Sequence, residues 1–175
     1  MSDRATVTLG AAPPSPAASG PQCSRAIFAG QTQFGPVGAP VICRSMRDYT
    51  NMFGARSGGA AMYDAAEFFL SQGGGELVVQ RASGPSAVLA TVSLSAGAIV
   101  VTAKNPGAYY NAYTAAYTTA TKTLTLVKGS KTITYTGADA AGLQSAASVD
   151  PDVTVTVTSL PGSNVAATNL ASGTD

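Results

Sequence analysis

The residues with the clearest potential for chemistry are three consecutive glycines, residues 73–75, in the stretch AAEFFLSQGGGELVVQRASG. A glycine-rich loop binds phosphate when it follows a strand and precedes a helix, because the helix N-terminus then points free N–H groups at the anion. Here a helical pattern leads into the glycines and a strand pattern leaves them, so the loop faces a helix C-terminus, whose dipole repels anions. No lysine followed by Ser or Thr closes a Walker-type pattern. We therefore expect Gly73, Gly74 and Gly75 to cap a helix and turn the chain.

Catalytic and metal-binding patterns are largely missing from the sequence. It contains no histidine, which excludes a Ser-His-Asp triad, a Cys-His pair and a histidine metal site. The acidic residues are scattered, and Asp150 and Asp152 in the tripeptide DPD predict a turn before a strand, with metal binding as the less favoured alternative. We expect no enzyme activity, no catalytic residues, no cofactor and no metal ion.

The composition of the 175 residues limits the class of partner. The net charge is +1 and only 11% of residues are charged, so the chain has no electrostatic footprint for nucleic acid or an anionic membrane surface. No apolar run approaches the roughly 20 residues of a membrane span, and the start lacks the apolar core of a secretory signal. A soluble protein made in a cytoplasm is expected, in which Cys23 and Cys43 remain thiols in preference to a disulfide. A surface with so few charges often packs against copies of the same protein.

The first 24 residues are expected to form an extended arm. The run ATVTL alternates like a short strand, and GAAPPSPAASGP then favours extended polyproline conformations. A strand without a local partner either stays disordered or joins a sheet elsewhere, on another chain for example. The residues expected to be donated in this way are Ala5, Thr6, Val7, Thr8 and Leu9.

Residues 25–84 predict a partial α/β layer. RAIFAGQ (residues 25–31) is an apolar run suited to a buried strand, and a brief second strand follows the Gly-Pro turns. Ser45 and Gly54 are good N- and C-caps for a helix whose apolar face carries the residues Met46, Tyr49, Met52 and Phe53. A second helix over residues 60–72 leads through the glycines to a strand over residues 76–81.

From residue 87 onward the pattern changes to short threonine- and valine-rich runs. AVLATVSL, AIVVTA, YTAAYTTA, KTLTLVKG, KTITYTG and VTVTVTS alternate with period two, which predicts an antiparallel sandwich or barrel, with a short helix in ADAAGLQSAAS. The predicted fold class is α+β: an N-terminal extended arm, a partial α/β layer, then an antiparallel β-sandwich or barrel-like domain. The predicted divisions are 1–24, 25–84, 85–170 and a short return segment, 171–175.

In this order the segments resemble the N-terminal portion of contractile phage tail sheath proteins. The resemblance lies in a GP-x-x-x-P turn, a serine-capped helix ending in FG, and a helix that leads through GG to a strand closing on arginine. It continues in the stretch NPGAYYN from Asn105, Pro106 and Gly107, which resembles the NPG-aromatic-x-N turn that opens the family's inserted β domain. NLASGTD resembles the family's L-x-G-G-T-D-G return to a larger main domain, with Ser172 at the first glycine position. We expect a fragment of a longer sheath protein, with an unusually short relative as the alternative.

The resemblance implies a structural virion protein of the phage tail, assembled in the host cytoplasm. Sheath subunits form six-membered rings stacked helically around a tail tube, and contraction drives the tube through the host envelope. Implied partners are copies of the same chain, the tail tube protein, and the baseplate and tail terminator proteins. Terminal arms add strands to neighbouring subunits, a role that residues 5–9 would fill. Arg81, at the end of a strand, either pairs with an acid of a neighbouring subunit or solvates a strand terminus.

Other function classes remain open at this stage. A tube or baseplate component of a phage tail is one alternative. A carbohydrate-binding β module is another, because Tyr109, Tyr110, Tyr113 and Tyr117 lie close together in the sequence and aromatic rings stack on sugars. In a β domain such tyrosines more often fill the core or a subunit contact. An enzyme is the least favoured class.

Overall fold

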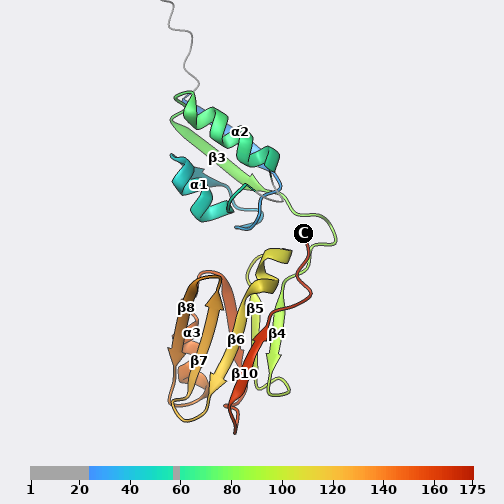
Figure 1. Cartoon of the computed structure of the whole chain (residues 1–175), viewed down its shortest axis with the longest axis vertical. Coiled ribbons are helices and arrows are strands. Elements are labelled where there is room, and N and C mark those ends of the chain that lie inside the picture. Colours follow the sequence, from blue (N-terminus) through green and yellow to red (C-terminus); the bar gives the residue numbers. More distant parts are fainter. Residues whose placement is uncertain (1–23, 57–59) are drawn as a thin grey trace, which may run out of the picture.

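The computed structural model describes residues 24–56 and 60–175, and the arm expected over residues 1–24 therefore lies almost entirely outside the described residues. The chain forms two lobes, each around its own apolar cluster, and its C-terminal end lies between them (Figure 1). The expected α+β class is confirmed. Within the described residues, no helix is both long enough and apolar enough to cross a membrane.

The first lobe contains a three-stranded sheet with helices on one of its faces. The strand order is β1-β3-β2, with β1 and β3 parallel and β2 and β3 antiparallel. Its elements are β1 (Arg25–Gly30), β2 (Val41–Cys43), α1 (Met46–Phe53), α2 (Ala60–Ser71) and β3 (Glu76–Arg81). Side chains of Leu77 and Val79 on the central strand pack against Tyr49 and Phe53 of α1 and Ala66 of α2.

Helix α1 begins and ends at the residues that the sequence predicts. The Ser45 hydroxyl accepts a hydrogen bond from the backbone N–H of Asp48 at 3.1 Å, and Gly54 ends the helix with a φ of 93°. Backbone and hydroxyl hydrogen bonds from Arg44 and Ser45 lower the pKa of the Asp48 carboxyl. The expected apolar face is correct except for Met52, which is 40% exposed.

Strand β1 is an edge strand, which corrects the expectation of a buried strand. Its residues alternate in exposure, and Ile27 is 72% exposed. The physical reason is that, within the part of the chain that the structure describes, β1 pairs only with β3 and helices cover only one face of the sheet. On the opposite face Val78 pairs in register with both Ile27 and Ile42, so a row of aliphatic side chains crosses three strands.

The three glycines between α2 and β3 have different structural roles. Gly73 has a φ of 88°, a conformation that residues with a side chain rarely adopt. A Cβ on Gly74 would lie 2.4 Å from the Phe69 ring. The backbone N–H groups of Gly75 and Glu76 donate to the carbonyl of Ser24, at 3.0 and 2.7 Å. The loop therefore turns the chain at a helix C-terminus and joins it to the residue that precedes β1.

The second lobe is a sandwich of two antiparallel sheets, with strand orders β10-β6-β7-β8 and β4-β5-β9. Inward side chains of both sheets form its core, and α3 packs against β8 and β9. Its elements are β4 (Thr91–Leu94), β5 (Ile99–Ala103), η1 (Ala108–Ala112), β6 (Thr114–Thr118), β7 (Thr123–Lys128), β8 (Lys131–Thr136), α3 (Ala140–Ala147), β9 (Val153–Val157) and β10 (Val165–Asn169). Six of these strands match the predicted runs.

Strand β10 and the short 3-10 helix η1 were not predicted. Four of the five residues of β10 are exposed, so its sequence VAATN lacks the alternation that marks a half-buried strand. It pairs with β6 across a register shift. Whether the predicted division near residue 85 separates two domains stays a prediction, although the two apolar clusters lie on either side of it apart from Phe34.

Cys43 is a buried free thiol, as expected, whereas Cys23 lies outside the described residues. Burial and, to a lesser extent, the nearby charge of Asp48 raise the pKa of the Cys43 thiol to about 11. The thiol is therefore protonated at neutral pH and serves as a small apolar side chain of the first lobe.

We predict that Gly73→Ala lowers the free energy of unfolding by about 1 kcal/mol, because an alanine at positive φ is strained even in open space. Urea unfolding of the full chain measures the change. Gly162→Ala is the matched control, since it also lies in open space but without a positive φ, and should change stability little. An equal loss in both variants would contradict this role of Gly73.

Candidate functional site

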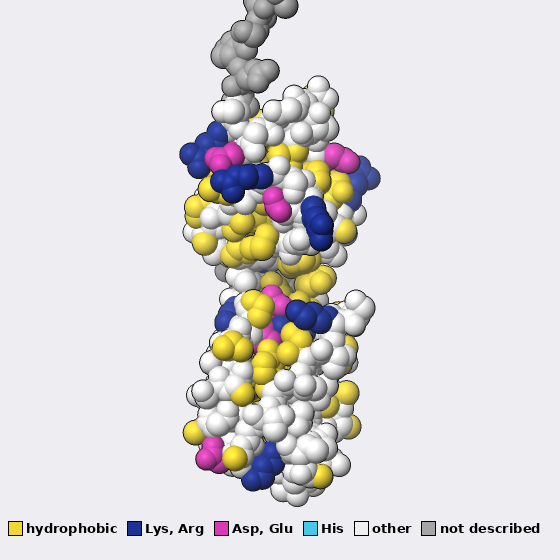
Figure 2. Space-filling view, turned by 90° about the vertical axis from the view of Figure 1, so that its left-hand side faces the viewer, with side chains coloured by type: hydrophobic (Ala, Val, Ile, Leu, Met, Phe, Trp, Pro, Cys, Tyr) yellow, Lys and Arg dark blue, Asp and Glu magenta, His cyan; other side chains and the backbone are white. Residues whose placement is uncertain are grey.

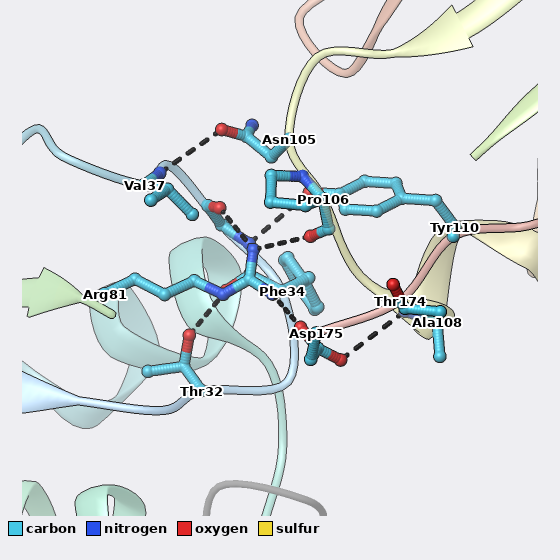
Figure 3. Close-up of polar contacts among 12 residues, drawn as sticks. Thr32, Phe34, Val37, Arg81, Asn105, Pro106, Ala108, Tyr110, Thr174 and Asp175 are labelled. Atoms are coloured by element: carbon cyan, nitrogen blue, oxygen red, sulfur yellow. Dashed lines mark hydrogen bonds and ion pairs between the residues drawn. The ribbon is translucent and has the colours of Figure 1, made fainter. Parts of the chain in front are cut away.

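The candidate site is the junction between the two lobes, drawn in Figure 3. It consists of Arg81 at the end of β3, the loop over residues 31–37, the turn and first helical residue over residues 105–108, and the last residues, 173–175. The loop over 31–37 follows β1 and belongs to the first lobe, whereas residues 105–108 link β5 to η1 in the second. Three chain segments that are distant in the sequence thus meet around one side chain.

Arg81 is the centre of this junction. Its side chain is only 1% exposed. Its Nη1 donates to the backbone carbonyls of Gly35 and Pro106, each at 2.9 Å, and its Nη2 pairs with Oδ1 of Asp175. One guanidinium therefore joins the first lobe, the second lobe and the end of the chain. The fixed fork of donors in arginine suits this arrangement, which a single ammonium group cannot reproduce.

Asp175 extends the same network to the helix η1. Its second carboxylate oxygen accepts a hydrogen bond from the backbone N–H of Ala108 at 3.4 Å. Gly107 lies directly between the partners, with a φ of 139°. A Cβ at Gly107 would lie 3.0 Å from both Nη2 of Arg81 and Oδ1 of Asp175. Glycine at this position lets the ion pair lie against the backbone.

Further contacts across the junction involve the loop over residues 31–37. The backbone N–H of Val37 donates to Oδ1 of Asn105 at 3.3 Å, and that of Gly35 donates to the Tyr110 hydroxyl at 3.4 Å. The Phe34 ring stacks on Tyr109 with a centroid separation of 4.4 Å. Polar and aromatic contacts therefore surround the ion pair.

The chain returns to the junction after β10 through Gly173. Asn111 bonds both backbone groups of Gly173: its Nδ2 donates to the carbonyl at 3.0 Å and its Oδ1 accepts from the N–H at 2.8 Å. A Cβ on Gly173 would lie 2.6 Å from the carbonyl oxygen of Gly107. The preceding residue, Ser172, has a φ of 66°, a left-handed conformation that favours glycine. An antiparallel bridge between Val88 and Thr174 completes the return.

The structure gives different results for the predicted site residues. Arg81 is buried and pairs with Asp175 of its own chain, so it is not a solvated strand end, whereas an ion pair with a neighbouring subunit stays a prediction. Asn105, Pro106 and Gly107 all lie in the junction turn. Strand donation by residues 5–9 concerns residues outside the described part of the chain and stays a prediction.

The four tyrosines proposed as an aromatic platform lie mainly in the core. Tyr110, Tyr113 and Tyr117 are 2%, 7% and 1% exposed, and Tyr109 is partly covered by Phe34. Burial raises the pKa of Tyr110 and of Tyr113. Flat exposed faces, which a sugar would need for stacking, are not available on the three buried rings.

A second ionic cluster lies inside the second lobe, between its two sheets. Lys128 at the end of β7 donates from Nζ to Oδ1 of Asp150 at 2.5 Å and to Oδ2 of Asp152 at 3.0 Å. The Tyr135 hydroxyl donates to the other Asp150 oxygen at 2.7 Å. Backbone N–H groups of Asp152 and Val153 also donate to Asp150. The side chains of Lys128 and Asp150 are 5% and 0% exposed.

These contacts determine the charge state of Asp150. Burial alone raises the pKa of this carboxyl, but hydrogen bonds from Lys128, Tyr135 and the backbone of Asp152 outweigh it and hold the pKa below its ordinary value. The DPD tripeptide lies directly before β9 as predicted and forms a bend, in which the N–H of Asp152 donates to the Asp150 carboxylate at 2.9 Å. No group of acids, cysteines or histidines with metal-binding geometry occurs within residues 24–56 and 60–175. The cluster is a structural ion network that ties β7 to the start of β9.

The sequence analysis singled out Arg81 as a candidate for an ion pair but missed its partner Asp175, and it missed Lys128 altogether. For Lys128 a signal existed: it continues the inward alternation of Leu124 and Leu126, which predicts a buried lysine that requires an acidic partner. For Arg81 a weaker signal of the same kind existed, since it is in phase with Leu77 and Val79 on β3. Its partner, Asp175, is too distant in the sequence to be identified by any local pattern.

Comparison with known proteins identifies solved structures with a similar fold. No protein-family model and no curated protein sequence matches the chain. A sheath tail protein from Listeria innocua has a similar structure, with a TM-score of 0.64 at 18% identity, over 85% of this chain and 33% of that one. A sheath tail protein from Desulfitobacterium hafniense has a TM-score of 0.62 at 17% identity, over 97% of this chain and 39% of that one. The expected resemblance to tail sheath proteins is confirmed at the level of fold, and the chain spans less than two fifths of the length of either protein.

We predict that Arg81→Ala lowers the free energy of unfolding by about 3 kcal/mol, because it leaves two buried carbonyls and a carboxylate without their shared donor. It should also separate the unfolding of the two lobes, since the guanidinium joins them. Differential scanning calorimetry then shows two transitions in place of one.

Arg44→Ala is the control for this substitution. Arg44 also pairs with an acid, Glu76 at 2.8 Å, but its side chain is 67% exposed and lies wholly within the first lobe. A surface pair of this kind contributes about 0–1 kcal/mol. A single, equally shifted transition in both variants would show that Arg81 does not couple the lobes.

We predict that acid destabilises the protein partly through Asp150. Because its folded pKa is lowered, the carboxylate stabilises the fold above the unfolded pKa of about 3.9, and this contribution is lost as the pH falls through the folded value. Asp150→Asn should lower stability at pH 7 by about 3 kcal/mol and flatten the acid limb of the stability profile. Urea unfolding between pH 2 and 7, a range of about five units around these pKa values, measures both effects. Asp64→Asn, at an exposed pair with Arg56, is the control and should leave stability at pH 7 nearly unchanged.

Proposed function

We propose that this chain is part of a structural subunit of a contractile tail sheath, which polymerises as stacked rings around a tail tube and contracts to drive the tube through a host envelope. The observation that carries the proposal is the match of its two-lobed fold to two sheath tail proteins over 85% and 97% of the chain. The ordered motifs of residues 25–113 support the same assignment independently of the fold.

The surface is consistent with a protein that packs against its own copies. Figure 2 shows a face with large uncharged and apolar areas, on which charged side chains of both signs gather mainly over the first lobe. Large apolar side chains with substantial exposure include Ile27, Ile42 and Phe68 in the first lobe. Exposed apolar patches of this kind support protein–protein contact.

The inter-lobe junction supports a mechanical role. In a contracting assembly, subunits rearrange as rigid bodies about flexible linkers, so each subunit has to keep its internal geometry. The buried Arg81–Asp175 pair and the surrounding backbone hydrogen bonds would resist rotation of one lobe against the other. We propose the division 25–84 for the core segment, 85–170 for the inserted β domain and 171–175 for the return toward a larger domain.

The proposed partners are other copies of the subunit, the tail tube protein, and baseplate and tail terminator proteins. Residues 5–9 would add a strand to a sheet of a neighbouring subunit, and the protein would reside in the virion tail. Head-to-tail contacts of this type generate helical assemblies in place of closed dimers. Another phage tail component is the second candidate, because the fold by itself does not determine the position in the tail.

The assembly test uses the protein that carries this chain, expressed with its tail tube protein and imaged by electron microscopy. Tubular particles with the subunit outside the tube support the sheath role. Particles in which the subunit forms the inner tube would contradict it in favour of a tube component. Failure to form any tubular or helical particle would remove the proposal altogether.

We predict that proline substitutions at successive positions of the arm alternate between a strong and a weak effect on assembly. Only alternate N–H groups of a donated strand face the acceptor, and proline removes one such donor. One of Thr6→Pro and Val7→Pro should therefore prevent tubular assembly and the other should weaken it much less. Electron microscopy and sedimentation measure the assembled fraction, with Ala17→Pro in the proline-rich stretch as the control. Full assembly in both variants would contradict strand donation by residues 5–9.

A further inference from the structure

An apolar groove lies in the first lobe between helix α2 and the edge strand β1. Its volume is about 510 Å³, within the usual range of binding pockets. The groove is lined by Phe28, Ala65, Phe68, Phe69, Gln72, Gly73 and Gly74. None of these residues is charged. The three strands and two helices of the first lobe leave this groove open, and Phe68 is 70% exposed.

The aromatic rings give the groove a fixed shape. Phe28 and Phe69 pack edge to face with centroids 6.0 Å apart. Gly74 lies against the Phe69 ring so closely that a Cβ there would be 2.4 Å away. Phe68 is the exposed member of the set. Aromatic walls around an uncharged groove are the feature that recognises extended proline-rich segments.

One segment of this chain is attached to the fold beside the groove. The carbonyl of Ser24 accepts hydrogen bonds from Gly75 and Glu76, so Ser24 lies beside the glycine turn that lines the groove. The polypeptide that precedes Ser24 is residues 1–23, which lie outside the described residues. The fold therefore holds the residue to which this segment is attached next to the groove.

The chemistry of this segment matches the groove. No charged residue occurs between Ala5 and Ser24, and the segment carries Pro13, Pro14 and Pro16 flanked by alanines. Proline-rich chain has a low conformational entropy because its φ is fixed, so it loses little on docking. Docking of this uncharged segment in the uncharged aromatic groove also removes no charged group from water, so it carries no such desolvation cost.

The lengths are also compatible. The lining residues on α2 and the glycine turn span about ten positions, or roughly 14 Å at helical rise. A polyproline segment of about five residues covers this distance at 3.1 Å per residue. Gly20 and Pro21 lie between the prolines and Ser24, and Gly-Pro is a turn signal that would direct the chain back along α2.

We propose that the proline-rich segment of residues 12–17 docks in this groove of its own chain, against Phe68 and Phe28. Its own segment is favoured over that of a second copy because the short connection to Ser24 gives a high effective concentration at the groove. The docking does not depend on the sheath role. Docking would also fix the place on the subunit surface from which residues 5–9 extend. The importance of that for strand donation rests on the proposed function.

The chain contains no tryptophan, so a single introduced indole reports on the groove without background. In the full chain we would measure acrylamide quenching of Phe68→Trp, with and without the triple change Pro13→Ser, Pro14→Ser and Pro16→Ser. The docked segment shields one face of the indole, so the triple change should raise the quenching constant by about twofold or more. Circular dichroism verifies that both proteins are folded.

Ile27→Trp is the matched control, because Ile27 is 72% exposed but lies on the opposite face of the sheet. Its quenching should not respond to the proline changes. Unchanged quenching of Phe68→Trp would overturn the proposal. Shielding that disappears on dilution would also overturn it, by assigning the groove to a second copy. All measurements use unassembled protein, so their outcome does not depend on whether the protein assembles into a sheath.

Discussion

The buried guanidinium of Arg81 is the constraint on which the arrangement of the two lobes depends. A charge with 1% exposure is costly unless its donors meet acceptors, and here Nη1 and Nη2 meet acceptors from three separate segments, whereas the buried Nε has no hydrogen-bond partner within the described residues. The contacts require the loop after β1 to approach the turn after β5, and the chain to return beside both. Glycine at position 107 follows from this, because a Cβ there would press on Nη2 of Arg81 and on the carboxylate of Asp175.

The second lobe uses the same device between its sheets. Lys128 lies at the end of β7, and its partner Asp150 lies just before β9 in the opposite sheet, with Tyr135 of β8 on the remaining oxygen. Both ionic centres therefore join segments from different layers. The core around the Lys128–Asp150 pair is built mainly from leucine, valine, alanine and tyrosine side chains, which are not directional in their packing. A buried pair adds geometric specificity at such a place, because removing one partner leaves an uncompensated charge.

The sequence predicted the features that depend on neighbouring residues. It did not predict those that depend on residues distant in the chain. Ser45 and Gly54 delimit α1 as predicted, since caps act within one helical turn, and six threonine- and valine-rich strands follow their alternation. The edge position of β1 could not be predicted, because it depends on which strands pair and which face receives helices. β10 gave no signal at all, since an exposed edge strand has no inward side chains to alternate. The partner of Arg81 lies 94 residues away, beyond any local pattern.

The geometry of the return segment shows which of its positions are determined by the backbone. Ser172 occupies the position where the resembling pattern has its first glycine, and its φ of 66° is the conformation that glycine adopts without strain. The next residue, Gly173, has no room for a Cβ beside Gly107. Such positions are set by backbone geometry, whereas most core positions of a sandwich accept any small or β-branched side chain of suitable volume. The fold matches two solved structures at TM-scores of 0.62 and 0.64 although only 17% and 18% of residues are identical, so the fold does not require the same residue at most positions.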